Sequence, residues 1–427
     1  MRGDVSQSTD HDHLESGQLG TADVTASTVA NIGPGIDFYF GFGVIAATAG
    51  VAAPLTILAA ALAVALLAST VAEFTRAEPS AGSFITYVDT ALGPRAGVAT
   101  ALLVAVGYTV AIASVFTMSG GLVAMTISQF TSWHPWWGPF TVVLTAAAIW
   151  LTVRGVKLST VAVGAAVLVQ VAIMLAVCFL VLVDQRAVLS GIPFSWAHLT
   201  GGLVGLSAGF PLALFMFIGW ENGPALAEES RDPRRTIPRA LYLSVAIASV
   251  LATLIAGADS QSRMLFDAGR TGLLPAKLGE VRPRSGTPVN ALLFMTAAGL
   301  GIIGIWWVSH LVTGDTGSMD PVGLYAECST LATIVILFVY FLTMVSLPVF
   351  MSRRHRASFS LLRHVAVPVL GSITLIVPFI ELCQPGQPAP YSAFPFIALA
   401  FVAAAAVIGW LFVDRHPRAG AGEGAEA

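Results

Sequence analysis

The stretch at residues 217–224 reads FIGWENGP, and it decides the fold because it puts helix breakers and a carboxylate inside an apolar run. The run covers residues 202–227, which is long enough to cross a bilayer core of about 30 Å. Gly219 and Gly223 permit non-helical dihedrals, and Pro224 removes a backbone donor. Irregular backbone at membrane depth is tolerated where protein encloses it, and there it forms substrate sites. The stretch therefore predicts a broken membrane helix that lines a binding site.

A second break of the same kind lies near the start of the chain. Residues 31–35 read NIGPG inside the apolar run 28–50. Glycines in membrane helices also serve as close-packing surfaces, which is the alternative explanation for either stretch alone. Two breaks that lie five spans apart favour a shared binding site.

The composition indicates an all-α polytopic membrane protein. Charged residues make up 11% of the 427 residues, against roughly 25% in an ordinary globular domain. The apolar runs show no alternation of two, so they predict helices rather than barrel strands. A net charge of −3 offers no basic face for nucleic acid. The cysteines Cys178, Cys328 and Cys383 have no metal-ligand spacing, and we expect neither a metal nor a cofactor.

The lengths of the apolar runs predict eleven membrane spans in the lipid bilayer. Lys and Arg cluster between alternate spans, whereas the loops 129–137, 312–321 and 384–392 hold none. Cytoplasmic loops collect basic residues, so we expect a cytoplasmic N-terminus. The predicted spans are 28–50, 52–73, 95–128, 138–153, 158–183, 202–227, 240–258, 288–311, 322–350, 364–383 and 393–413.

The span at 240–258 conflicts with this charge pattern. Basic clusters lie on both sides of it, at 231–239 and at 263–284. A single crossing would put the second cluster outside, while two crossings would require about 40 apolar residues. We expect the 263–284 loop to stay cytoplasmic, with the segment re-entrant or misplaced.

The chain resembles an amino acid permease of the amino acid–polyamine–organocation superfamily over about residues 27–415. The resemblance rests on NIGPG, on the long motif that begins with FIGWENGP and ends in PRRTIPRA at residue 240, and on four further motifs. These are PSAGSFITYVDTALGP (79–94), RGVKLS (154–159), SQSRMLFDAGRTGLLP (260–275) and TPVNAL (287–292). The resemblance implies a leucine-transporter-like fold of two inverted five-helix repeats, with substrate between broken helices one and six.

The resemblance also implies a division of the chain. The first repeat would cover 27–184, a shortened second repeat 202–350, and two final spans 364–413. The composition of residues 1–26 and 416–427 predicts disordered tails. Such permeases have twelve spans, with a seventh and an eighth between PRRTIPRA and SQSRMLF. Those motifs are here separated by one apolar segment, which implies the loss of one hairpin.

The family pattern implies a set of substrate-binding residues. The substrate carboxylate would meet the backbone amides of Gly33, Gly35 and Ile36, and the amine would meet the carbonyls of Ile32, Phe215 and Ile218. This follows the general affinity of helix N-termini for anions and of C-terminal carbonyls for cations. Phe215 would be an aromatic gate, beside Gly219 at the second break. Trp220 would wall the side-chain pocket, and Tyr108 is either a pocket residue or a core residue.

Two carboxylates are candidate coupling groups. Asp37 departs from the family pattern, and a charge at membrane depth is a functional candidate. It would pair with an amine, carry a coupled proton, or cap a helix. Glu221 matches a family carboxylate and is either a proton site or a buried structural group. The coupling ion, H⁺ or Na⁺, stays open.

The resulting function is secondary import of amino acids or related amines across the plasma membrane by alternating access. The alternative is a truncated relative that does not transport, because span eight lines the pathway in this fold. No nucleophile, base and metal-ligand constellation lies at membrane depth, so we expect no enzyme activity.

Overall fold

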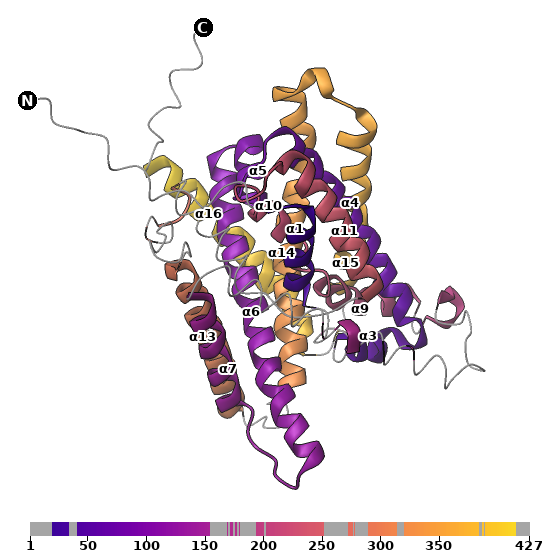
Figure 1. Ribbon diagram of the computed structural model, residues 1–427, viewed down its shortest axis with the longest axis vertical. Coiled ribbons are helices and arrows are strands. Elements are labelled where there is room, and N and C mark those ends of the chain that lie inside the picture. The colour runs from indigo at the N-terminus through magenta and orange to yellow at the C-terminus, as the bar shows by residue number, and fades with distance from the viewer. Residues whose placement is uncertain are drawn as a thin grey trace, which may run out of the picture.

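The computed structural model describes the chain as a bundle of helices (Figure 1). The described residues are 19–33, 41–153, 169, 171–173, 176, 179, 194–199, 202–251, 272–275, 277, 289–313, 320–383, 387 and 389–415. Within them no β-ladder occurs, apart from one isolated bridge between Leu19 and Ser230. The predicted all-α class is confirmed.

Two described helices overlap the first predicted span, which the sequence predicts to be broken at NIGPG. Helix α1 covers Thr21–Ile32, and α3 covers Phe42–Ala49. The 3-10 turn η2 (Gly50–Ala52) leads into α4 (Ala53–Ala77), whose second residue is a proline that suits a helix start. Helix α1 is thus a half-helix that ends at the NIGPG motif.

The next described helices are α5, α6 and α7. The short α5 (Ser83–Leu92) packs against α6 (Pro94–Phe130), which is the longest helix of the described residues. Helix α7 (Gly138–Val153) coincides with the predicted span. The predicted span at 158–183 lies almost entirely outside the described residues.

The second half starts with the other broken span. Helix α9 (Leu203–Phe215) and the single turn α10 (Asn222–Ala225) are separated by non-helical residues 216–221. The remaining helices are α11 (Pro233–Leu251), α13 (Val289–Thr313), α14 (Pro321–Arg354), a π-helical turn η9 (Leu362–Ala366), α15 (Val367–Leu382) and α16 (Phe394–Arg415). Short 3-10 turns lie at Trp196–His198, Arg356–Ser358 and Tyr391–Ala393.

Helices α6 and α14 form the centre of the bundle and pack along one another (Figure 1). A Cβ atom at Gly107 of α6 would lie 2.6 Å from the side chain of Ile336 of α14, so this glycine allows the close approach. The most apolar windows of α6 and α14 are 72% and 67% buried, but that of α13 is 28% buried. Five helices in the described part are long and apolar enough to span a membrane, and most of the apolar window of α13 is not buried against the other helices.

The N-terminal region differs from the prediction. A disordered tail was expected up to residue 26, but α1 begins at Thr21. The Asp23 carboxylate accepts the Gly20 N–H at 2.9 Å, which fixes the helix start. Leu19 donates its N–H to the Glu229 carbonyl at 3.0 Å and accepts the Arg231 N–H at 3.1 Å. These contacts with a distant loop order the segment, and they cannot be predicted from the residues next to Leu19 alone.

The predicted span at 240–258 also differs in its start. Helix α11 begins earlier, at Pro233, and packs along α4 and α1. Residues 252–271 lie outside the described residues, so the expected path of this segment stays a prediction.

Candidate functional site

The two helix breaks meet in the middle of the bundle. Helix α1 ends at Gly33, whose φ of 75° and ψ of 59° are left-handed. Gly219, between α9 and α10, has a φ of 111°. Both values lie in the region that favours glycine, so the sequence places glycines where the backbone requires them.

Gly219 lies directly against the end of α1. A Cβ atom at this residue would lie 2.5 Å from the Asn31 carbonyl oxygen and 2.9 Å from the Ile32 nitrogen. The Asn31 side-chain amide also donates to the Gly219 carbonyl at 3.1 Å. The space that the sequence assigned to substrate beside Gly219 is therefore filled by the α1 backbone in this conformation.

Glu221 is the centre of a buried polar cluster. Its Oε1 accepts a hydrogen bond from the Tyr108 hydroxyl of α6. Its Oε2 accepts the Gly219 N–H at 3.0 Å and the Tyr340 hydroxyl of α14 at 3.5 Å. The side chains of Glu221, Tyr108 and Tyr340 are almost fully buried. Among the described residues no basic side chain forms an ion pair with Glu221, so neutral donors alone hold it.

Trp220 extends this cluster with aromatic packing. Its indole donates to the Tyr340 hydroxyl at 3.3 Å. Its ring packs edge-on against Phe84 of α5, with centroids 6.0 Å apart. Trp220 is fully buried among these rings. The expectation that it walls a side-chain pocket remains a prediction for another conformation.

Phe215 lies at the end of α9 and is buried. Its ring contacts Tyr325 of α14 edge-on, with centroids 6.0 Å apart. The Phe215 carbonyl accepts the Ile218 N–H at 2.9 Å in the turn that ends α9. Ile32 ends α1, Phe215 ends α9, and Ile218 lies in the turn after α9. All three residues of the predicted amine site thus lie beside the two breaks, and all three are buried. Gly35, Ile36 and Asp37 lie outside the described residues, and their roles stay predictions.

The two asparagines at the breaks were not predicted as site residues. Asn222 donates its side-chain amide to the Ser27 hydroxyl of α1 at 3.0 Å, one helical turn from Asn31. Tyr340 was also missed, because a tyrosine in an apolar helix carries no local signal that separates a polar contact from core packing. For Asn31 the signal existed, since it begins the NIGPG motif.

A second cluster of polar side chains joins the C-terminal ends of α4 and α14. Glu73 forms an ion pair with Arg76 at 2.6 Å, and its carboxylate lies 3.5 Å from Nε2 of His364. Glu78 pairs with Arg354 at 3.5 Å. The α4 end is thus tied to α14 and to the turn η9. Within the described part, no three His, Cys, Asp or Glu side chains converge on a metal-sized site.

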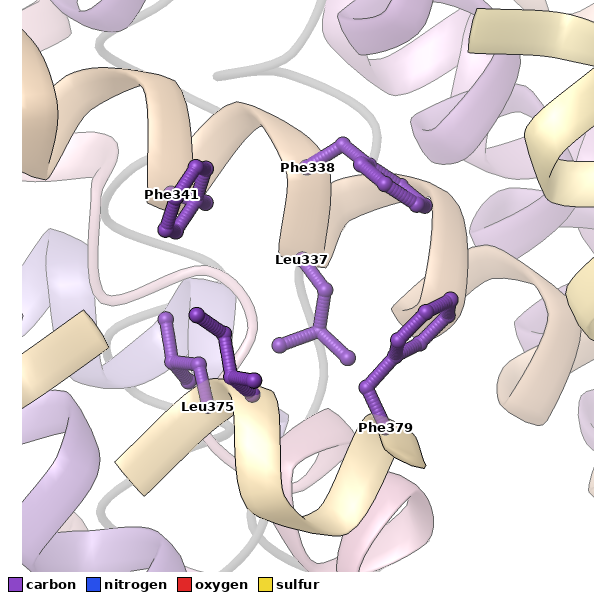
Figure 2. A pocket seen from close by; sticks show the side chains of 6 residues that line it. Leu337, Phe338, Phe341, Leu375 and Phe379 are labelled. Atoms are coloured by element: carbon purple, nitrogen blue, oxygen red, sulfur yellow. The ribbon is translucent and has the colours of Figure 1, made fainter. Parts of the chain in front are cut away.

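An apolar cavity of about 210 Å³ lies between α14 and α15 (Figure 2). Its lining is entirely hydrophobic, and Phe338 and Phe379 face each other across one end of it, with centroids 5.4 Å apart. The lining residues are Leu337, Phe338, Phe341, Leu375, Ile376 and Phe379. Since it holds no polar group, it offers nothing to orient an amino acid.

Comparison with known proteins links this geometry to transport. A family model described as amino acid permease matches residues 26–251 and 241–419. A branched-chain amino acid permease from Bacillus subtilis (strain 168) is 23% identical over 343 residues, covering 65% of this chain and 72% of that protein. A gamma-aminobutyric acid permease from Escherichia coli (strain K12) is 27% identical over 344 residues, covering 67% and 72%. A D-serine/D-alanine/glycine transporter of the same strain is 24% identical over 221 residues, covering 39% and 45%.

The fold is shared with a solved transporter. A crystal structure of a mutant manganese transporter from Eremococcus coleocola has a TM-score of 0.50 at 12% identity, and the match covers 96% of this chain and all of that one. This likeness concerns the fold alone, and it agrees with the leucine-transporter-like class expected from the sequence.

Proposed function

Because the chain belongs to the amino acid permease family, we propose that it imports amino acids or related amines across the plasma membrane by alternating access. The observation that carries the proposal is the direct contact of the two breaks at Gly219 and Asn31. Non-helical backbone from two halves of a carrier meets in this way where a substrate binds. Membership of the family supports transport, and the mechanism and direction are our inference.

The proposed substrate class rests on the names of the relatives, and the groups at the two breaks suit it. The relatives are named for branched-chain amino acids, for gamma-aminobutyric acid, and for D-serine, D-alanine and glycine, all of which carry an ammonium and a carboxylate. We assign the ammonium to the carbonyls of Ile32, Phe215 and Ile218. We assign the carboxylate to the backbone amides of Gly33, Gly35 and Ile36. Both assignments follow helix-end electrostatics.

The Glu221 cluster is our candidate for the gate below this site. It joins α6, the second break and α14 through Tyr108 and Tyr340. On the topology expected from the charges, the α1 start, α10 and the ends of α4 and α14 face the cytoplasm. The pairs Leu19–Ser230 and Glu78–Arg354 would then close the cytoplasmic side, and opening requires this set to separate.

Coupling to an ion has two candidates in the sequence. Glu221 is buried beneath the breaks and is held by neutral donors, which suits a group that exchanges a proton when the gate opens. Asp37 would carry a proton or pair with an amine from the first break. Sodium remains the alternative coupling ion.

A transport-incompetent relative is the second candidate function. One observation favours it: the family match divides into two parts that overlap at residues 241–251. This is the segment where the sequence indicates the loss of a hairpin. Such a protein would fold and bind nothing.

Uptake by the reconstituted protein tests the proposal. Proteoliposomes are given radiolabelled leucine, D-alanine or gamma-aminobutyric acid, with a proton or sodium gradient imposed. We expect saturable uptake of at least one substrate, inhibited by the unlabelled compound. A monodisperse protein that shows neither uptake nor a thermal shift with any of these substrates would establish the incompetent relative instead. The variant Gly301→Ala is a control that should behave like the unchanged protein, because a Cβ atom at residue 301 meets nothing within 4 Å.

A further inference from the structure

The turn between α14 and α15 combines arginines with exposed leucines. Residues 353–364 read RRHRASFSLLRH, which contains four arginines and no acidic residue. Leu361 and Leu362 are 72% and 70% exposed. The turn lies at one end of the bundle, beyond the ends of both helices (Figure 1). Large apolar side chains exposed among like charges indicate a partner that is both apolar and anionic.

This turn has a fixed shape. His364 is buried, and its Nδ1 accepts the Ser360 N–H at 2.8 Å. The ring of Phe359 packs against the His364 ring, with centroids 5.6 Å apart. The 3-10 turn Arg356–Ser358 and the π-helical turn η9 complete the connection. The two leucines are therefore held outward by an ordered backbone.

Two of the four arginines tie the turn to the bundle. Arg354 pairs with Glu78 at the end of α4 at 3.5 Å. Arg353 donates to the Ala91 carbonyl of α5 at 3.4 Å. These two side chains position the turn against its neighbours.

The other two arginines keep their guanidinium groups available. Arg356 uses its Nε to donate to the Ser352 carbonyl at 2.8 Å, and its terminal nitrogens form no other contact with the described residues. Arg363 is exposed and has neither an ion pair nor a side-chain hydrogen bond within the described part of the chain. Two positive charges thus face outward on either side of the leucine pair.

The turn lies at the level of the lipid headgroups. Helix α14 is long and apolar enough to span the membrane and ends at Arg354, and the apolar stretch that contains α15 begins at Leu362. A short connection between two such helices emerges just outside the hydrocarbon core. On the topology expected from the charges, this is the cytoplasmic leaflet, whose lipids carry negative charge.

We infer that this turn docks on anionic phospholipids, with Arg356 and Arg363 at the phosphate groups and with Leu361 and Leu362 in the acyl boundary. The planar guanidinium group binds two phosphate oxygens at once. Leucines that flank basic residues insert in this way at membrane interfaces. An acidic protein partner would match the charges, but the leucines lie where lipid already surrounds the helix ends.

A bound phospholipid would act on the end of the bundle to which the turn is tied. Nε2 of His364 lies 3.5 Å from the Glu73 carboxylate of α4, and Arg354 reaches Glu78 of the same helix. Lipid at the turn would therefore hold the ends of α4 and α14 together. The docking surface itself does not depend on the proposed transport, so it is tested without any amino acid.

Lipid binding to the purified full-length protein in detergent tests the surface. The protein is titrated with phosphatidylglycerol or with phosphatidylcholine, and bound lipids are counted by native mass spectrometry. We expect phosphatidylglycerol to bind more tightly and to raise the melting temperature further. Arg356→Gln combined with Arg363→Gln should weaken phosphatidylglycerol binding roughly 30-fold and leave phosphatidylcholine binding unchanged. Leu361→Ser combined with Leu362→Ser should weaken the binding of both lipids.

The matched control removes the same charge elsewhere. Arg234 and Arg239 are exposed on α11, and no exposed leucine pair lies between them. Arg234→Gln combined with Arg239→Gln should leave the affinity for phosphatidylglycerol unchanged. Inorganic phosphate alone should not raise the melting temperature, because it offers nothing to the leucines.

Four outcomes would overturn the inference. They are equal affinity of the unchanged protein for the two lipids, an arginine variant or a leucine variant that binds phosphatidylglycerol normally, an equal loss in the α11 control, and equal protection by inorganic phosphate. If the double arginine variant does not fold, Arg363→Gln alone should weaken binding roughly fivefold, and a folded single variant of normal affinity also contradicts the surface. Absence of amino acid uptake, by contrast, would count against the transport proposal alone.

Discussion

Replacing Gly219 with alanine tests whether the contact between the two breaks defines this conformation. The new Cβ atom would lie 2.5 Å from the Asn31 carbonyl oxygen and 2.7 Å from its carbon. Both are backbone atoms of α1, so no side chain can rotate away. The φ of 111° adds strain for any residue with a Cβ atom.

The expected effect is large. Backbone strain of this kind costs about 1–3 kcal/mol. Overpacking in a tight interior costs about 1–3 kcal/mol more. The clash with the α1 backbone destabilises only the state in which α1 touches the break. Even about 2 kcal/mol corresponds to a shift of roughly 30-fold toward states in which α1 has moved away.

The assay is thiol labelling at Thr28, which is fully buried and faces Gly223 across the α1–α10 contact. Thr28→Cys is introduced into a background without Cys178, Cys328 and Cys383. We expect Gly219→Ala to raise the labelling rate of this cysteine roughly 30-fold. Gly301→Ala, which adds the same methyl group in open space on α13, should leave the rate unchanged. Equal rates in the two variants would refute the reasoning.

Three further predictions follow from the site and from the topology. Tyr108→Phe and Tyr340→Phe each remove a donor to buried Glu221, which costs about 1–3 kcal/mol, and should lower the melting temperature and impair coupled uptake. Tyr87→Phe loses a buried bond to Thr75 away from the breaks and should spare coupling, so equal loss of coupling in all three variants would argue against a gate. Asp37→Asn should abolish binding of amines that lack a carboxylate while sparing neutral amino acids; equal loss of both would remove amine recognition as its role. Cysteines at Ser285 and Gly314 are probed with an impermeant reagent in intact cells, where we expect labelling at Gly314 alone; the reverse pattern would show that the second half is inverted.

The fold class and the two helix breaks were predictable because the lipid environment makes them local properties of the sequence. A glycine or proline at membrane depth is costly unless the break is used, so NIGPG and FIGWENGP located both breaks. Gly33 and Gly219 indeed have positive φ values. The contact between them required no further information than the pairing of broken helices in this fold.

Other features depend on three-dimensional packing and could not be predicted from the sequence. Helices α6 and α13 have nearly equal hydropathy, 2.1 and 2.0, yet 72% and 28% of their windows are buried. Lipid and protein are equally apolar, so hydropathy does not distinguish a central helix from a peripheral one. Likewise, the unpaired side-chain oxygen of Asn31 follows from the bond of its nitrogen to the Gly219 carbonyl, which no sequence pattern encodes.

The ordered N-terminal segment has a similar explanation. Leu19 pairs with residues more than 200 positions away, through backbone groups that every residue possesses. A polar stretch with such a partner has the same composition as a disordered one. The expectation of disorder up to residue 26 was therefore wrong at its C-terminal end.

Counterflow in proteoliposomes tests the central claim of alternating access most directly. Vesicles are loaded with a high concentration of unlabelled substrate and diluted into a trace of the labelled compound, with no ion gradient. A carrier whose site opens to one side at a time should accumulate the label transiently above its equilibrium level, and Gly219→Ala should change the rate of this exchange. Label that only equilibrates would indicate a channel, and label that never enters would indicate a relative that does not transport; either result would contradict the account.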